Sequence, residues 1–135
     1  IHSSPLKNAI IEKTSEKVEN ESIRCFSFKT NGPDVFGAPQ VSFIFDMPKT
    51  GKYLVSIKAI KGPDQGIVQL SQHDQTLGEP ADLYAPSLKC NSNIKLGILD
   101  LSQGNNVIYF KLIGKNPESK GLNMKLVEVV FEWIK

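Results

Sequence analysis

The sequence contains few of the residues that build metal sites and disulfide frameworks. Its 135 residues include only two cysteines and two histidines, too few and too far apart for paired zinc ligands or a set of disulfides. Cys25 and Cys90 leave two alternatives: buried free thiols that act as small apolar side chains, or one disulfide from an early strand to the middle of the chain. His73 adjoins Asp74, but neighbours in a strand point to opposite faces, so this pair is not a preformed acid–base unit.

Long apolar runs and blocks of like charge are absent as well. The longest apolar run has four residues, whereas a membrane-spanning helix needs about twenty, so we expect no membrane span. Sixteen Lys and Arg are scattered among fourteen Asp and Glu, and without a basic cluster nucleic acid is not an expected partner. The first residues lack the features of a signal peptide, as a processed chain also would, so export remains an open alternative.

The composition is typical of a folded domain. Hydrophobic residues make up 40% of the chain, charged residues 22%, and the net charge is +2. This length predicts a single domain, 1–135, that can bury its own core, with residues 1–8 as a frayed terminus.

Short segments with apolar residues at strand period make up most of the chain. We expect hairpins across the turn at 48–52 and between 67–73 and 76–78, and an irregular connection over 78–93. Residues 9–17 form either a helix or, as we favour, an edge strand. The other predicted strands are 22–29, 40–47, 52–60, 94–101, 107–114 and 123–134.

Eight or nine strands without a repeat or an internal boundary predict an all-β fold, a two-sheet antiparallel β-sandwich. We favour a jelly roll over an immunoglobulin-like topology. Long connections separate the hairpins, and the Cys and Trp spacing of antibody domains is absent.

Turn-forming residues gather between 61 and 121, in GPDQG, GEPADLY and GKNPESKG. Neither glycine-rich loop precedes a helix, so we expect tight turns rather than phosphate binding. Polar side chains in and near these loops either fasten the turns or contact a polar ligand. The candidate ligand-binding residues are Asp64, Gln65, Gln69, Tyr84, Lys115 and Asn116.

No catalytic set stands out, and we expect the protein not to be an enzyme. Carboxylates of the turn-rich region would have to converge across a cleft to hydrolyse a glycoside, and a small hydrolase using Asp64 or Asp82 is the outlying alternative. Glu19 and Glu21 are weak candidates for a structural calcium, because Ca²⁺ takes about six to eight oxygen ligands. The alternative for this pair is a solvated strand entry. We expect no other cofactor.

The ordered set GPDQGIVQ, GEPADLYAP and GKNPESKG resembles a carbohydrate-binding-module-like β-sandwich domain associated with glycoside-hydrolase-related proteins of saccharolytic bacteria. The resemblance covers about 51–131, more than half of the chain. It implies a galactose-binding-like or jelly-roll fold, a secreted, periplasmic or cell-surface location, and a non-catalytic accessory role. The partners it implies are an oligo- or polysaccharide and a neighbouring catalytic domain. The matching residues are Gly62, Pro63, Asp64, Gly66, Gln69, Asp82, Leu83, Tyr84, Gly114, Lys115, Asn116 and Ser119.

The chain departs from this family at Gln65, where an aromatic residue is usual. A sugar site needs an aromatic ring for stacking, and the candidates are Tyr84, Phe36 and Trp133. Trp133 is the weakest, because the apolar face of the last strand should bury it. The alternative function is a structural or interdomain-packing β-sandwich, favoured by Phe26 and Phe28 on the nominal outer side of their strand.

Overall fold

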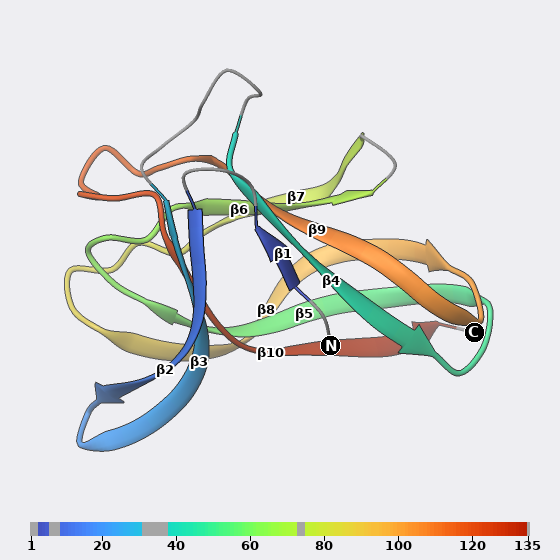
Figure 1. The fold of residues 1–135 in the computed structure, drawn as a ribbon, viewed down its shortest axis with the longest axis horizontal. Helices are drawn as coiled ribbons and strands as arrows, with labels where there is room; N and C mark the ends of the chain where they lie inside the picture. The colour runs from blue at the N-terminus through green and yellow to red at the C-terminus, as the bar shows by residue number, and fades with distance from the viewer. Residues whose placement is uncertain (1–2, 6–8, 31–37, 73–74, 135) are drawn as a thin grey trace.

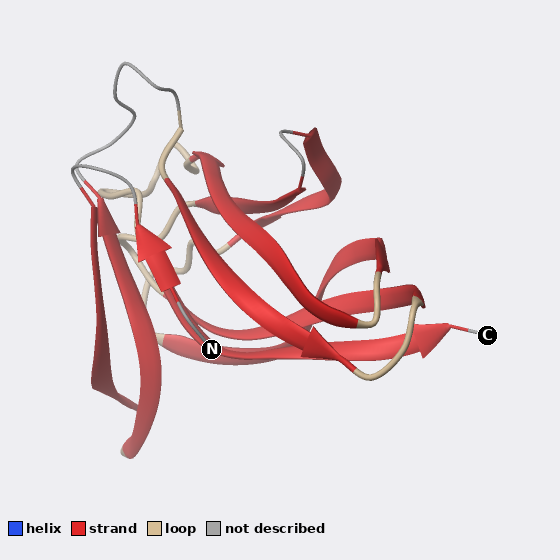
Figure 2. Ribbon diagram, turned by 45° about the vertical axis from the view of Figure 1, so that its right-hand side comes forward, coloured by secondary structure: helices blue, strands red, loops and turns tan. Residues whose placement is uncertain are grey.

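The chain forms two five-stranded antiparallel sheets packed face to face in a computed structural model that describes residues 3–5, 9–30, 38–72 and 75–134 (Figure 1). Sheet A has the order β1-β4-β9-β6-β7 and sheet B the order β2-β3-β10-β5-β8. All elements of the described residues are strands or loops (Figure 2), which confirms the predicted all-β sandwich. The strands are β1 Ser3–Pro5, β2 Ala9–Val18, β3 Glu21–Thr30, β4 Gln40–Met47, β5 Gly51–Lys61, β6 Ile67–Gln72, β7 Gln75–Asp82, β8 Lys89–Leu101, β9 Gly104–Gly114 and β10 Met124–Ile134.

The N-terminal part of the chain is more regular than its sequence indicates. Strand β2 confirms the edge-strand alternative for residues 9–17. Within the terminus predicted to be frayed, Ser3–Pro5 pair with Val41–Phe43 of β4 as strand β1, because β4 has an open backbone edge on that side. The described residues contain no helix that is long and apolar enough to cross a membrane.

The predicted hairpin across 48–52 is wrong. Strand β4 pairs with β1 and β9 in sheet A, whereas β5 pairs with β8 and β10 in sheet B. The connection therefore carries the chain from one sheet to the other. This arrangement places the apolar faces of both strands in the same core, which a hairpin within one sheet would not bring face to face.

The second predicted hairpin is confirmed, since β6 pairs with β7. Its turn, with His73 and Asp74, lies outside the described residues. The irregular connection predicted over 78–93 is wrong over most of its length, because β7 continues to Asp82 and β8 begins at Lys89. An edge strand needs backbone partners on only one side and few apolar side chains, so β7 does not show a strand pattern in the sequence.

Aromatic side chains hold the two sheets together. The Phe43 ring of sheet A lies 5.5 Å from Phe26 of sheet B and 5.7 Å from Phe110, both in edge-to-face geometry. Phe28 is fully buried in the same cluster. Phe26 and Phe28 thus contribute to the core and not to an outer surface, because their side of β3 is the one that faces sheet A.

A smaller cluster lies on the other face of sheet B. Val18, Cys25 and Ile60 are buried there, with Cys90 and Val127 packed against them. A β-bulge between Leu126 and Glu128 places Val127 in this cluster. The single apolar face predicted for β10 is therefore divided between the two sides of the sheet.

The two cysteines are free thiols. Cys25 is on β3 and Cys90 on β8, and strands β10 and β5 lie between them. At about 4.8 Å per strand, the two Cα atoms are about 14 Å apart, beyond the roughly 7 Å that a disulfide can bridge. The disulfide alternative is wrong, and the buried Cys25 instead lies 3.5 Å from the Thr14 hydroxyl.

Glu19 and Asn20 form the two-residue turn between β2 and β3. Both have left-handed backbone conformations, with φ angles of 49° and 70°. Two consecutive positive φ angles are typical of a type I′ hairpin turn. Glu19 and Glu21 thus belong to a tight, exposed hairpin end, and the described residues contain no group of three or more acidic, His or Cys side chains suited to a metal.

We expect Glu19→Asn with Asn20→Gly to raise the free energy of unfolding by about 1 kcal/mol, because Asn-Gly adopts this turn with less backbone strain. Urea denaturation of both proteins measures the change. The control is Glu12→Asn in the middle of β2, where the described backbone has a negative φ and no gain is expected. A double variant no more stable than the parent would contradict the turn assignment.

Candidate functional site

Three loops interlock at the end of the sandwich where β5 finishes. Backbone bonds join Lys120 to the Pro63 carbonyl at 2.8 Å, Gly66 to the Asn123 carbonyl at 2.9 Å, and Ala85 to the Gly62 carbonyl at 3.0 Å. The turn motifs that dominate the sequence therefore bind one another. They form a cross-linked end to the domain.

Ser119 lies at the centre of this loop cluster and is 6% exposed. Its hydroxyl is 2.8 Å from the Gln65 carbonyl, 3.0 Å from the Gly121 carbonyl and 3.2 Å from the Pro63 carbonyl. Because a hydroxyl has a single proton, it donates to one of these acceptors at a time. Ser119 belongs to the GKNPESKG motif, but nothing in the sequence indicates this structural role.

Asn116 and Asp82 fasten the same cluster. The Asn116 amide donates to Asp82 Oδ2 at 2.8 Å, and Asp82 Oδ1 accepts the backbone N–H of Tyr84 at 3.0 Å. Asn116 Oδ1 also accepts the Glu118 N–H at 3.0 Å. These side chains stabilise turns, which is one of the two roles considered for Asn116.

The remaining predicted ligand residues are dispersed. Gln65 is 2% exposed and its Oε1 has no hydrogen-bond partner. Of its two alternatives, ligand contact would need an outward side chain. The Asn123 N–H donates to the Asp64 carbonyl and the Gly66 N–H to the Asn123 carbonyl, and the Gln65 side chain between them lies inside the loop cluster. Asp64 and Lys115 are exposed and Tyr84 is half-buried.

Gln69 lies away from the loops, on the outer face of sheet A. Its amide donates to the Gly78 carbonyl of β7 at 2.9 Å. Phe36, an aromatic candidate for stacking, lies outside the described residues.

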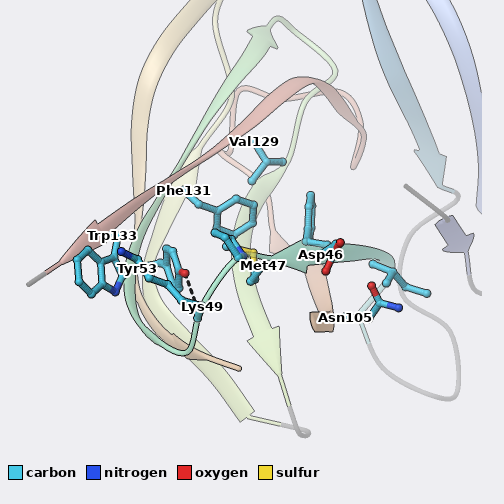
Figure 3. Close-up of a pocket in the computed structure, with 11 residues that line it drawn as sticks. Asp46, Met47, Lys49, Tyr53, Asn105, Val129, Phe131 and Trp133 are labelled. Carbon is cyan, nitrogen blue, oxygen red and sulfur yellow. Dashed lines mark hydrogen bonds between the residues drawn. The ribbon is translucent and has the colours of Figure 1, made fainter. Parts of the chain in front are cut away.

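A groove of about 1030 Å³ opens at the other end of β5 and runs along β4 (Figure 3). Strand β1 pairs only with the first half of β4, so the described chain leaves the second half open on the side away from β9. None of the six predicted ligand residues lines this groove. Its lining residues are Ile44, Phe45, Asp46, Met47, Pro48, Lys49, Tyr53, Asn105, Val129, Phe131 and Trp133.

Trp133 is the exposed aromatic residue of the groove. It is 39% exposed, so the prediction that its strand buries it is wrong. Its ring is covered by Lys49, whose Nζ lies 3.2 Å from the ring centroid, and not by a strand of sheet A. The Tyr53 hydroxyl donates to the Lys49 carbonyl at 2.5 Å and holds this connection in place.

Close backbone packing also orients the Trp133 ring. A Cβ atom at Gly51 would lie 2.5 Å from Trp133 Nε1, so the ring rests directly on the glycine backbone. Cation–π contact and this packing fix the indole at the mouth of the groove. Gly51 was the one sequence signal for this contact, because a glycine in a strand often marks the close approach of another group.

Trp133, Tyr53 and Lys49 lie on one side of the groove, and Asp46 and Asn105 lie on the other (Figure 3). Phe131 packs edge-to-face on Phe45 at 4.9 Å and on Tyr53 at 6.4 Å. Asp46 and Asn105 are paired neighbours on β4 and β9 and provide a carboxylate and an amide on the opposite side. The groove therefore combines a flat apolar ring with hydrogen-bonding groups, a combination suited to a polyhydroxylated ligand.

Comparison with known proteins supports the fold class. No protein-family model and no curated protein sequence matches the chain. Among solved structures, a xanthan lyase from Paenibacillus superposes with a TM-score of 0.70 at 22% identity, over 93% of this chain and 12% of that one. A GH26-CBM35 β-(1,4)-mannanase from Podospora anserina superposes with a TM-score of 0.58 at 12% identity, over 99% of this chain and 28% of that one. The chain thus has the fold of a small part of two larger glycan-processing enzymes.

Proposed function

We propose that this domain is a non-catalytic carbohydrate-binding accessory module of an exported glycan-processing protein. The observation that carries the proposal is Trp133, a 39% exposed side chain whose ring is covered by the exposed Lys49 side chain and not by a strand, in an open groove that also carries Asp46 and Asn105. Sugars present apolar C–H faces and polar hydroxyl edges. An aromatic ring beside hydrogen-bonding side chains accommodates both.

The structural neighbours support this proposal by their context. Each is a much longer chain that acts on a polysaccharide, and this domain corresponds to 12% and 28% of their lengths. The proposal therefore includes a neighbouring catalytic domain as partner, with this domain holding the glycan near it. Since the described groove has no clustered acid–base or nucleophilic set beyond the single carboxylate Asp46, binding suits it better than catalysis.

Titration calorimetry with β-(1,4)-mannan oligosaccharides and xanthan fragments, preceded by a glycan array to widen the panel, tests the proposal. We expect Trp133→Ala to weaken binding of the recognised saccharide by roughly tenfold or more, because stacking on the ring is lost. Trp133→Phe retains a flat ring and should restore part of the affinity.

The matched control is Ile98→Ala, at a side chain 56% exposed on β8, away from the groove. It should bind like the parent. If the parent binds no saccharide at millimolar concentration across the panel, or if Trp133→Ala binds as well as the parent, the proposed function is wrong.

A structural packing role is the second candidate, and a different surface favours it. Leu54, Ile98, Val130 and Ile134 lie on the outer face of sheet B, and the last three are 56%, 44% and 36% exposed. Apolar residues grouped on an outer face are typical of an interface. A clean monomer by light scattering, together with an unchanged state in Ile98→Glu, would remove the support for self-association through this face.

A further inference from the structure

A row of hydroxyl groups crosses the outer face of sheet A. Strands β4, β9 and β6 are neighbours in sheet A (Figure 1). Ser42 on β4, Tyr109 on β9 and Ser71 on β6 are paired in register, so their side chains stand side by side. Side chains directly opposite in antiparallel strands have Cβ atoms about 5 Å apart. Tyr109 is half-buried and supplies an aromatic ring at the centre of the row.

The next row on the same face carries amides and an ammonium group. Gln40, Lys111 and Gln69 are paired across the same three strands. These two rows contain no carboxylate, and apart from Lys111 their polar groups can both donate and accept hydrogen bonds. Such groups match sugar hydroxyls, which also do both. A protein partner would favour an apolar centre, which these rows lack.

Tyr109 is the residue of the hydroxyl row that offers surface to a ligand, because it is half-buried whereas Ser42 and Ser71 are 8% and 5% exposed. The side chains of Ser42, Tyr109 and Ser71 make no hydrogen bond to any residue that the structure describes. None of their hydroxyl oxygens is fully buried without a partner. Gln69 is the exception among the polar side chains, because its amide is held by the Gly78 carbonyl. This bond places the Gln69 carboxamide at a fixed position beside Lys111.

The polar face is continuous with the Trp133 groove. The pair next to the hydroxyl row on the same face of β4 and β9 is Ile44 with Val107. The pair after that is Asp46 with Asn105. Ile44, Asp46 and Asn105 also line the groove. A chain of sugars that leaves the groove over β4 would therefore meet Tyr109 about two rows later, because successive rows on one face lie about 7 Å apart.

We infer that the saccharide site continues from the groove onto the outer face of sheet A, with Tyr109 as a second stacking platform. This inference rests on the proposed function and specifies the ligand class: extended glycan chains, bound more tightly as they lengthen, rather than single sugars or chain ends.

Titration of the purified domain with β-(1,4)-mannan oligosaccharides, from disaccharide to hexasaccharide, and with short and long xanthan fragments tests it. For the saccharide that binds, we expect the affinity of the parent to rise by roughly tenfold or more from the shortest to the longest ligand. Tyr109→Ala should remove this gain and leave the affinity for the shortest ligand unchanged. Trp133→Ala should weaken all lengths.

Two further variants keep the test decisive. Tyr109→Phe retains the ring and should keep most of the rise in affinity with ligand length. Because it also preserves the packing of the ring, it allows the test even if Tyr109→Ala folds poorly. Lys111→Gln, in the adjacent row, should lower affinity for long ligands only. If Tyr109→Ala and Tyr109→Phe both bind long ligands like the parent while Trp133→Ala does not, the extended site is wrong and the groove stands. If the parent binds none of these saccharides, both proposals fall.

Discussion

Gly78→Ala should lower the free energy of unfolding by about 3–4 kcal/mol, one of the largest effects of any single substitution outside the aromatic core. Gly78 is on β7, at the edge of sheet A, and has a φ angle of 72°. A Cβ atom there would lie 1.9 Å from the backbone oxygen of Leu96 on β8, at the edge of sheet B. Because the obstacle is backbone, one of the two sheets would have to move.

The same contact involves a second glycine from the other sheet. Gly97 has a φ angle of 140°, and a Cβ atom there would meet the Gly78 Cα at 2.8 Å. The two glycines thus permit the edges of the two sheets to touch and close this side of the sandwich. Urea denaturation of Gly78→Ala and Gly97→Ala measures the effect.

Gly104→Ala is the matched control. Its φ angle is 95°, but nothing lies within 4 Å of the added Cβ, so only the conformational cost of about 1–2 kcal/mol applies. If Gly78→Ala and Gly104→Ala lower the free energy of unfolding equally, the close approach of β7 to β8 does not add to the cost of a side chain at Gly78.

Phe43→Ala should lower the free energy of unfolding by about 3–5 kcal/mol, the usual range for removal of a buried aromatic side chain. Phe43 is 1% exposed, and its ring contacts Phe26, Phe45 and Phe110. Its loss would leave a cavity between the sheets and remove the edge-to-face contact with Phe26, one of those that join sheet A to sheet B. Thermal and urea unfolding measure the change.

Val107→Ala provides the comparison for Phe43→Ala. Val107 is on the outer face of β9 and 42% exposed, so its loss should cost less than about 1 kcal/mol. Phe43→Leu retains most of the volume and should fall between the two. Equal effects for Phe43→Ala and Val107→Ala would show that the inter-sheet cluster does not dominate stability.

Strand positions were largely predictable, whereas of the two predicted strand pairings only that of β6 with β7 is confirmed. Residues 40–47 match β4 at both ends, because period-2 alternation of large apolar residues is a local property. Strand β4 pairs with β1 and with β9, which begins more than fifty residues after β4 ends, whereas the short turn after β4 wrongly indicated β5. A turn sequence describes the local bend, but it does not distinguish a hairpin from a crossing between two sheets.

In the candidate site, too, local features could be predicted from the sequence and contacts between distant segments could not. The turn motifs were recognisable, and the structure shows that Asn116, Asp82 and Ser119 tie them to each other. The groove could not be found in this way, because Asp46, Asn105 and Trp133 come from three distant segments without a shared motif. Trp133 was noted only as the weakest aromatic candidate, since its expected burial depended on which residues cover the end of β10.

The sequence alone determined the all-β class, the placement of most strands and the turn-rich character of the loops, because alternation, glycine and proline act on neighbouring residues. Only the tertiary structure decided that two strands separate the two free cysteines, that the loops fasten one another, and that Trp133 is 39% exposed in a groove with Asp46 and Asn105. The separation of the cysteines depends on sheet order, and the side of the sheet on which Trp133 lies depends on the bulge in β10; both arise from packing between segments far apart in the chain.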